Sequence, residues 1–208
     1  MKQIYSQLTQ IRPVCVLDAT HPYADEVTKN IKEACQTAGF PYMRILRENT
    51  DMTENVTGSA KAHIRVADSM REAVDLLNDK PYLEKNILLT TGSKHLPDYT
   101  KIQDYQNRAY LRLLPSPEML QKAVDTGFLP AHLIAMQGPF SQELNVALIK
   151  QSGIGVLVTK QSGKSGGFEE KISAAEQTGT DVIVIKRPKQ EDGKNLSEAE
   201  AELKKIMT

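Results

Sequence analysis

The sequence predicts an α/β fold with two Rossmann-like domains, each built on a doubly wound, mainly parallel sheet, and a cleft between them. Short apolar runs alternate with helical patterns along almost the whole chain, as in parallel sheets covered by helices. Runs such as 86–90 and 155–159 are short and unbroken, which is typical of strands buried on both faces. Polar clusters follow several of these runs, at the strand ends where α/β proteins bind their ligands.

The elements follow from the spacing of the apolar residues. Short apolar runs predict strands near 14–18, 41–46, 63–67, 87–91, 109–114, 132–136, 154–159 and 181–186. Apolar residues at helical spacing predict helices at about 3–10, 24–38 and 68–79, from Ser116-Pro117, after Ser141, at 167–178 and from Ser197.

Capping residues mark the ends of several of these helices. Gly39 is expected to end the second, Asp68 to begin the third and Ser141 to begin the fifth. Ser197 and Glu200 have the spacing of a capping box for the last helix. Since a helix ends before a new strand near 78–81, we expect an N-terminal domain of residues 1–80 and a C-terminal domain of residues 81–208.

Composition narrows the class of protein. Apolar residues make up 40% and charged residues 25% of the 208 residues, and the formal net charge is zero, which argues against a nucleic-acid partner. No apolar stretch is long enough to span a bilayer, and residues 1–8 lack the apolar core of a signal peptide. Cys15 and Cys35 are expected to be reduced, and neither they nor the histidines have the spacing of a metal site. We therefore expect a cytoplasmic protein with no membrane partner and no bound metal.

The most informative stretch is 17–23, which ends a predicted strand and precedes a helix. Asp18, Thr20, His21 and Tyr23 would lie where a ligand binds, although turn and cap roles explain Asp18 and Thr20 equally well. Because a proline follows it, His21 is pushed toward an extended backbone. Its ring would either donate a hydrogen bond to a ligand, or cap the following helix or bind a backbone carbonyl oxygen.

Two further strand ends carry small polar residues. Thr90, Thr91, Gly92 and Ser93 offer hydroxyl donors and a close backbone approach, or form a plain turn. The segment 159–167 supplies Thr159, Lys160, Ser162 and Gly163 before a helix, a combination that suits a phosphate. Val158 occupies the position where a Walker motif requires glycine, so this segment is no P-loop, and a solvated loop is the alternative.

Other candidates lie at a turn and at strand ends. Gly138, Phe140 and Ser141 belong to a tight turn in which Ser141 caps the next helix. The arginines Arg44, Arg47 and Arg187 follow predicted strands, where guanidinium groups bind carboxylates or phosphates, although exposed arginines are common.

In this order and spacing, these motifs resemble the precorrin-6A reductase (cobalt-precorrin-6A reductase) family of cobalamin biosynthesis. The resemblance rests on 18–23, 89–93, 138–141 with Glu143, 158–163 and Arg187-Pro188, and it spans roughly residues 14–188. It implies reduction of a tetrapyrrole, precorrin-6A or cobalt-precorrin-6A, to its 6B form by NADPH or NADH, without deciding between the two cofactors.

The resemblance also implies roles for the candidate residues. His21 and Tyr23 would orient the substrate or assist a proton transfer. The cofactor would be bound by Thr90, Thr91, Gly92, Ser93, Thr159, Lys160, Ser162, Gly163 and Arg187. The substrate, which carries many carboxylates, would be bound by Asp18, Thr20, His21, Arg44, Arg47, Gly138, Phe140 and Ser141.

The sequence departs from the family at its start. The family begins with a strand and a Gly-Gly-Thr turn that supports the dinucleotide, and this sequence has no such turn. The first domain is therefore expected to be truncated relative to the family, and its exposed sheet edge favours self-association into a homo-oligomer.

Two other classes of function stay open at this point. One is a non-catalytic ligand-binding α/β protein with an incomplete dinucleotide site. The other is a glycosyl- or phosphoryl-transferring enzyme that uses the 159–163 loop for a nucleotide. Binding of a reduced nicotinamide favours the reductase, whereas a preference for sugar or triphosphate nucleotides favours the transferase.

Overall fold

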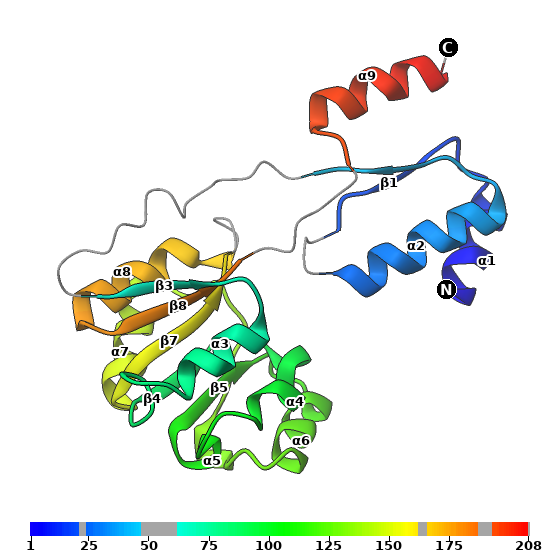
Figure 1. Cartoon of the computed structure of the whole chain (residues 1–208). Coiled ribbons are helices and arrows are strands. Elements are labelled where there is room, and N and C mark those ends of the chain that lie inside the picture. Colours follow the sequence, from blue (N-terminus) through cyan, green and yellow to red (C-terminus); the bar gives the residue numbers. More distant parts are fainter. Residues whose placement is uncertain (21–23, 47–61, 162–165, 187–192, 208) are drawn as a thin grey trace. The chain divides into compact units, whose positions relative to one another are not determined.

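A computed structural model describes residues 1–20, 24–46, 62–161, 166–186 and 193–207 (Figure 1). The chain forms two compact units. The larger unit comprises Asp51–Arg187, and the smaller unit comprises Met1–Thr50 together with Pro188–Thr208.

The larger unit is built on a six-stranded sheet in which every neighbouring pair of strands is parallel. In spatial order the strands are β3 (Ile64–Ala67), β8 (Asp181–Ile185), β7 (Ile154–Lys160), β4 (Asn86–Leu89), β5 (Ala109–Leu113) and β6 (Leu133–Ala135). The central strands β4, β7 and β8 are almost wholly buried, which explains why their sequences are unbroken apolar runs.

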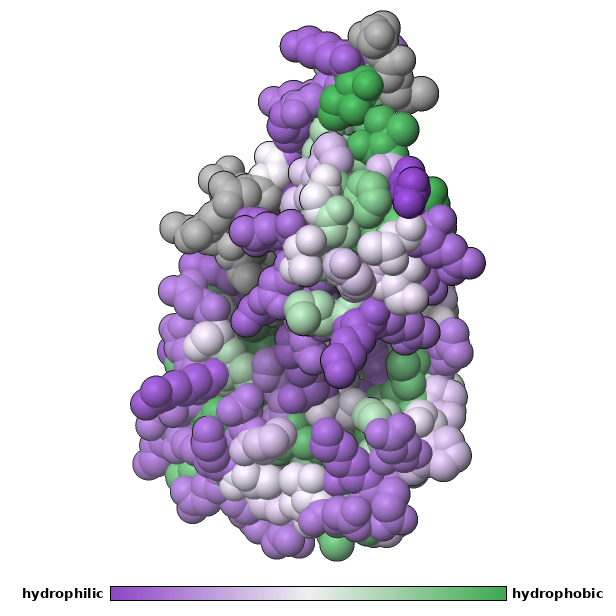
Figure 2. All heavy atoms as spheres, turned by 90° about the vertical axis from the view of Figure 1, so that its right-hand side faces the viewer, coloured by the Kyte–Doolittle hydropathy of each residue, from purple (hydrophilic) through white to green (hydrophobic). Residues whose placement is uncertain are grey.

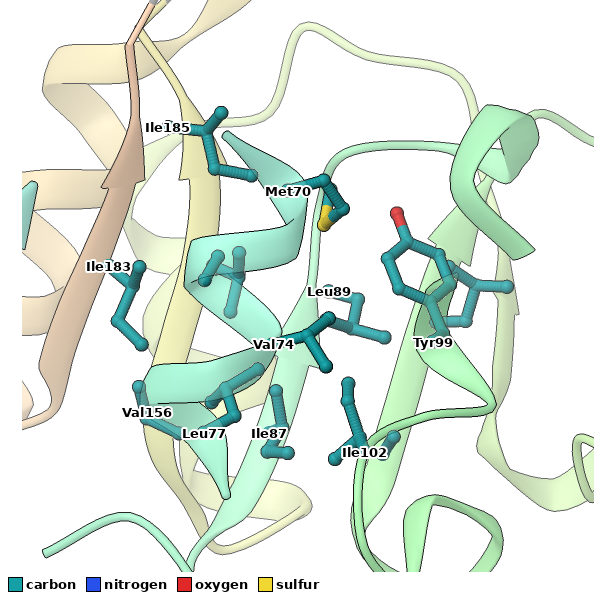
Figure 3. Close-up of a cluster of buried hydrophobic side chains, with 14 of the residues drawn as sticks. Met70, Val74, Leu77, Ile87, Leu89, Tyr99, Ile102, Val156, Ile183 and Ile185 are labelled. Atoms are coloured by element: carbon teal, nitrogen blue, oxygen red, sulfur yellow. The ribbon is translucent and has the colours of Figure 1, made fainter. Parts of the chain in front are cut away.

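One face of this sheet is covered by α3 (Met70–Leu77), α4 (Leu96–Tyr99), α5 (Tyr105–Arg108) and α6 (Pro117–Asp125). Met70, Val74 and Leu77 of α3 point toward Ile87 and Leu89 of β4 (Figure 3). Two short 3₁₀ helices, Ser93–His95 and Pro130–His132, connect elements of this unit.

The opposite face is covered by α7 (Gln142–Gln151) and α8 (Phe168–Thr178). Successive residues of a strand point to opposite faces, so Leu88 and Leu157 pack under these helices while their neighbours pack under α3 and α4. The sheet therefore has two separate apolar cores, one on each side.

The smaller unit contains β1 (Val16–Asp18) and β2 (Tyr42–Arg44), which are parallel, with α1 (Lys2–Ile11), α2 (Asp25–Ala38) and α9 (Leu196–Met207). Leu8 of α1 and Ala34 and Cys35 of α2 form its core. In the C-terminal segment of this unit, the backbone of Lys194 forms a parallel bridge with Ile45, just after β2.

The α/β class, the parallel sheets and the expected helices and strands are confirmed, with differences at element ends. Ser69, not Asp68, caps α3, because its hydroxyl accepts a hydrogen bond from the amide of Glu72. The last helix is capped by Asn195 and not by Ser197: Asn195 and Glu198 exchange side-chain to backbone hydrogen bonds. The short helices α4 and α5 and the two 3₁₀ turns were not expected.

The structure divides the chain differently from the expected domains of residues 1–80 and 81–208. β3 lies before residue 80 but pairs with β8, so it belongs to the larger sheet. The C-terminal segment with α9 belongs to the smaller unit. The division into two units is therefore determined by hydrogen bonds between strands that are distant in sequence. The helix-to-strand transition near 78–81 does not determine it.

On the face shown in Figure 2, hydrophilic residues predominate among the described residues, and hydrophobic ones lie in smaller groups between them. Among the described residues, no helix has both the length and the apolar character needed to cross a membrane.

At the amino ends of the strands, Arg108 joins several loops. Its buried guanidinium donates to the carbonyl oxygens of Leu77 (2.8 Å), Tyr82 (2.6 Å), Lys85 (3.1 Å) and Gln103 (2.7 Å). Burial lowers the pKa of Arg108, and the charge of Asp104 opposes this shift. Because all four bonds go to backbone oxygens, this side chain holds the segment 77–85 against the start of β5.

We predict that Arg108→Met lowers the free energy of unfolding by about 3 kcal/mol, because buried carbonyl groups lose charged donors. Urea unfolding followed by circular dichroism measures the change. Arg71→Met, on the exposed side of α3, is the control and should change stability by less than about 0.5 kcal/mol. Equal losses in the two variants would contradict the assigned role of Arg108.

Candidate functional site

The strand order of the large sheet reverses between β4 and β7. From β4 the chain continues to β5 and β6 on one side, whereas from β7 it continues to β8 on the other. The connection after β4 runs through α4 on one face, and the connection after β7 runs through α8 on the opposite face. The two loops therefore diverge, which makes the carboxyl ends of β4 and β7 a topological switch point, where open α/β sheets bind ligands.

Thr90 joins the two strands at this point. Its amide and its hydroxyl both donate to the carbonyl oxygen of Val158, at 2.9 and 2.8 Å. Thr159, the next residue of β7, is buried, and its hydroxyl lies 3.4 Å from the carbonyl oxygen of Lys160. The side chains of Thr90 and Thr159 thus support the strand ends from within.

The turn after β4 is held by a buried tyrosine. The Tyr99 hydroxyl donates to the carbonyl oxygen of Gly92 (3.0 Å) and accepts a hydrogen bond from the hydroxyl of Thr91. Burial raises the pKa of Tyr99, so its proton stays in place for this bond. The Thr91 side chain therefore helps to hold the loop after β4 in place.

Gly92 and Ser93 form the accessible part of this turn. Gly92 has φ 77° and ψ −171°, a conformation almost restricted to glycine, and a Cβ atom there would project into open space. The Ser93 hydroxyl lies 3.1 Å from the Met119 sulfur, a weak acceptor that a better partner can replace.

Positive charge gathers beside this turn. Burial lowers the pKa of His95; the hydrogen bond to Asp98 (3.1 Å) raises it, and the charges of Lys160 and Lys94 lower it further. Lys160 is the last residue of β7, and Lys94 lies in the turn after β4, so cations flank the switch point from both strands. This arrangement favours an anionic ligand.

The loop after β6 is the second candidate region. Ser141 caps α7 by accepting a hydrogen bond from the amide of Leu144 (3.3 Å), as expected. Phe140 packs against the Arg112 guanidinium, which lies 4.2 Å from the ring centroid. Gly138 lies so close to Phe140 that a Cβ atom would be 3.0 Å from its ring. The three predicted residues of this loop therefore form one packed turn.

In the smaller unit, Asp18, Thr20 and Arg44 come together at the carboxyl ends of β1 and β2. Arg44 Nη1 binds the Asp18 carboxylate (2.6 Å) and the Thr20 hydroxyl (2.7 Å), and Nη2 donates to the Thr20 carbonyl oxygen (3.0 Å). Tyr42 donates to the other oxygen of Asp18 (2.8 Å). These bonds fix the chain where it enters residues 21–23.

The pKa of Asp18 reflects this environment. Burial raises it, but the hydrogen bonds from Thr20 and Tyr42 and the charge of Arg44 outweigh burial, so the net shift is downward. These interactions thus favour the carboxylate form of Asp18 although the residue is only 1% exposed.

Comparison with known proteins matches the family described as "Precorrin-6x reductase CbiJ/CobK" over residues 1–205. The chain belongs to this family. A protein of Priestia megaterium named cobalt-precorrin-6A reductase is 37% identical over 183 residues, which cover 86% of this chain and 67% of that protein. A protein of the same name from Salmonella typhimurium is 33% identical over 186 residues, which cover 89% of this chain and 67% of that protein.

A third cobalt-precorrin-6A reductase, from Methanothermobacter thermautotrophicus, is 36% identical over 175 residues, covering 84% of this chain and 55% of that protein. The chain therefore spans between about half and two thirds of the length of these relatives. The solved structure "CobK precorrin-6A reductase" shares the fold, with a TM-score of 0.69 and 24% identity over 99% of this chain and 78% of that chain. The precorrin-6x reductases are oxidoreductases of cobalamin biosynthesis.

The structure groups the residues expected for this reductase family into three sets. Thr90, Thr91, Gly92 and Ser93 lie at the switch point with Thr159 and Lys160. Gly138, Phe140 and Ser141 form the turn before α7, and Asp18, Thr20 and Arg44 form the cluster in the smaller unit. Six expected residues lie outside the described part of the chain: His21, Tyr23, Arg47, Ser162, Gly163 and Arg187.

Several side chains that support the reductase loops were not expected from the sequence. They are Tyr42, Tyr99, Arg112, Asn145 and Lys171. Arg112 offered a signal, since it is the one charged residue in the apolar stretch 109–114, and a cation in a buried strand needs a specific partner. The others look like ordinary helix or strand residues.

We predict that Asp18→Asn lowers the free energy of unfolding by about 3–5 kcal/mol near neutral pH, because Arg44 stays buried without its counter-charge. A carboxyl with a lowered folded pKa stabilises the protein above its unfolded pKa, about 3.9, and this contribution is lost as the pH falls through the folded pKa.

The measurement is urea unfolding of both proteins from pH 7 to pH 3. The stability gap between wild type and Asp18→Asn should narrow as the pH falls below about 4. Asp75→Asn on the exposed face of α3 is the control and should track the wild type throughout. A gap independent of pH would show that the charge of Asp18 does not stabilise the fold.

Proposed function

We propose that this chain catalyses the nicotinamide-dependent reduction of a corrin-ring precursor, precorrin-6A or cobalt-precorrin-6A, to its 6B form. The family match over residues 1–205 carries the proposal. The electropositive switch point of the larger sheet supports it, because a dinucleotide is an anion and parallel α/β sheets bind such ligands there.

The residues at the switch point fit a nicotinamide dinucleotide. Gly92 lets a pyrophosphate approach the backbone closely, since no Cβ atom occupies the open space beside it. Ser93 offers a hydroxyl that donates to a sulfur, a weak acceptor, and Lys160 carries a positive charge. When bound, NADPH or NADH supplies the hydride. Ser162, Gly163 and Arg187 are proposed to complete the cofactor site.

The remaining expected residues are proposed to bind the tetrapyrrole. The substrate would pack against the turn formed by Gly138, Phe140 and Ser141. The guanidinium of Arg47 would bind a substrate carboxylate. His21 and Tyr23 would orient the macrocycle or hold a proton.

Arg44 has a more specific proposed role. Its guanidinium binds Asp18 and Thr20, so we assign these three residues to holding the entry to residues 21–23 and not to a direct grip on a carboxylate. Arg44 therefore affects substrate binding indirectly, because it holds the backbone that leads into residues 21–23.

The alternatives of a non-catalytic binding protein and a nucleotide-using transferase are not favoured, because the relatives are named as reductases. We further propose that the reaction takes place in the cytoplasm and requires no nucleic-acid or membrane partner. Self-association through the edge of the small sheet stays a prediction, and sedimentation equilibrium tests it: a monomer at all concentrations would contradict it.

The proposed function predicts a thermal shift on titration with NADPH or NADH, with and without a tetrapyrrole precursor. A ligand that binds only the native state stabilises it by about 2.7 kcal/mol at a hundredfold excess over Kd. One nicotinamide should raise the melting temperature more than the other, and the precursor should add to the effect. Absence of any shift in a cooperatively melting protein would contradict the reductase proposal.

Gly92→Ala should weaken NADPH or NADH binding about tenfold, equivalent to about 1.4 kcal/mol, because alanine shifts the backbone of the turn. Gly153→Ala, at a positive φ of 57° before β7 at the opposite edge of the sheet, is the matched control. It should lower the melting temperature and leave nicotinamide affinity unchanged. Equal affinities of both variants and the wild type would remove Gly92 from the cofactor site.

A further inference from the structure

Two cations are buried on the α7 and α8 side of the large sheet. Arg112 of β5 is 6% exposed and Lys171 of α8 is 7% exposed. Burial lowers the pKa of Lys171 to about 8, with a further contribution from the charge of Arg112, while Glu170 opposes the shift. Two like charges out of water cost free energy that an apolar pair would avoid. Their presence therefore calls for a role beyond packing.

Arg112 holds the turn before α7 at two points. Its Nη1 donates to Asn145 Oδ1 (2.8 Å), and its guanidinium lies 4.2 Å from the Phe140 ring centroid. The Asn145 amide in turn donates to the carbonyl oxygen of Ser141 (2.8 Å). The position of this turn thus depends on the planar guanidinium, which stacks on a ring while it donates along its edge.

Lys171 holds the neighbouring loop in a similar way. Its Nζ donates to the carbonyl oxygen of Gly166 (2.7 Å), just before α8. The two loops lie close together, since a Cβ atom added to Gly167 would lie 3.8 Å from the Phe140 carbonyl oxygen. Arg112 and Lys171 therefore support two adjoining loops from beneath.

Neither cation is placed to serve fold stability alone. Both lie near the N-terminal ends of α7 and α8, where the helix dipoles disfavour positive charge. Arg108, four residues before Arg112, shows the contrasting case: its four hydrogen bonds within the described part of the chain all go to backbone carbonyl oxygens at the amino edge of the sheet.

We propose that Arg112 and Lys171 are positioning residues, which hold the 138–141 turn and the 166–167 segment in the geometry that receives the tetrapyrrole and the cofactor. This inference rests on the proposed function for its ligands, but the placement of the loops can be measured without turnover.

The test compares the same substitution at two buried arginines, Arg112→Lys and Arg108→Lys. Arg112→Lys keeps the charge and loses the planar group, so it should raise KM for the tetrapyrrole at least about tenfold and speed amide hydrogen exchange in 137–145. Arg108→Lys should lower the melting temperature, leave KM unchanged and speed exchange only near 77–85 and 103–108.

Two further variants keep the test independent of how Arg112→Lys folds. Phe140→Leu removes the ring and keeps Arg112; it should raise KM similarly, and combining it with Arg112→Lys should add little, because the two changes remove one contact. Lys171→Met should speed exchange in 166–170 and weaken nicotinamide binding.

The proposal is overturned if Arg112→Lys has the KM and the amide exchange rates of the wild type. It is also overturned if Arg108→Lys raises KM as much as Arg112→Lys does, because the rise in KM would then be a consequence of lost stability. If the wild type turns over no precursor, the proposed function fails. Amide hydrogen exchange in 137–145 and 166–170 is then the remaining test. Faster exchange in the Arg112 and Lys171 variants than in the wild type supports the positioning role, and unchanged exchange overturns it.

Discussion

The parallel pairing of β4 with β7 is the constraint on which the candidate site of the large sheet depends. The two strands are separated by 68 residues at the Thr90 to Val158 hydrogen bond, so closing this contact costs chain entropy. Apolar residues on both faces of the strands offset that cost, with Ile87 and Leu89 in one core and Leu88 and Leu157 in the other. Because β4 and β7 send their connections to opposite faces, the same pairing also forms the candidate ligand edge.

Buried polar side chains then shape the loops at that edge. Tyr99 fixes Gly92, Arg112 fixes the turn containing Phe140, and Lys171 fixes Gly166. In each case a long side chain rooted in a strand or helix reaches a loop, so the loop takes its geometry from the rigid scaffold. A loop positioned in this way can present backbone groups to a ligand with little loss of entropy on binding.

Sequence patterns predicted the parts of this structure that depend on local information. The unbroken runs gave β4 and β7, and polar residues after them marked the switch point, because both signals lie within a few residues. The domain division was not predictable in this way. The membership of β3 depends on its pairing with β8, and that of α9 on a bridge between Ile45 and Lys194, and neither contact has a local signature.

The roles of charged residues were also only partly predictable. Arg44 was expected to meet a substrate carboxylate, because the family resemblance implies a substrate with many carboxylates, and the structure pairs it with Asp18. The sequence contains Arg44 and Asp18 but does not show that they lie close together in the fold, so their pairing was not predictable. Arg112 could have been noticed as a charge in a buried strand, yet its partners, Phe140 and Asn145, come from a turn and a helix about 30 residues later.

The distribution of charge links these observations to the ligand. Positive and negative residues balance over the whole chain, 26 against 26, so net charge gives no long-range attraction to an anion. At the carboxyl edge of the large sheet, however, Lys94, Lys160, Arg112 and Lys171 gather around loops that begin helices, and the helix dipoles add to their field. Positive charge at this edge favours an anionic ligand there. The buried cations therefore have two consequences at once: they fix the loops, and they set the potential in which a dinucleotide phosphate or a substrate carboxylate would bind.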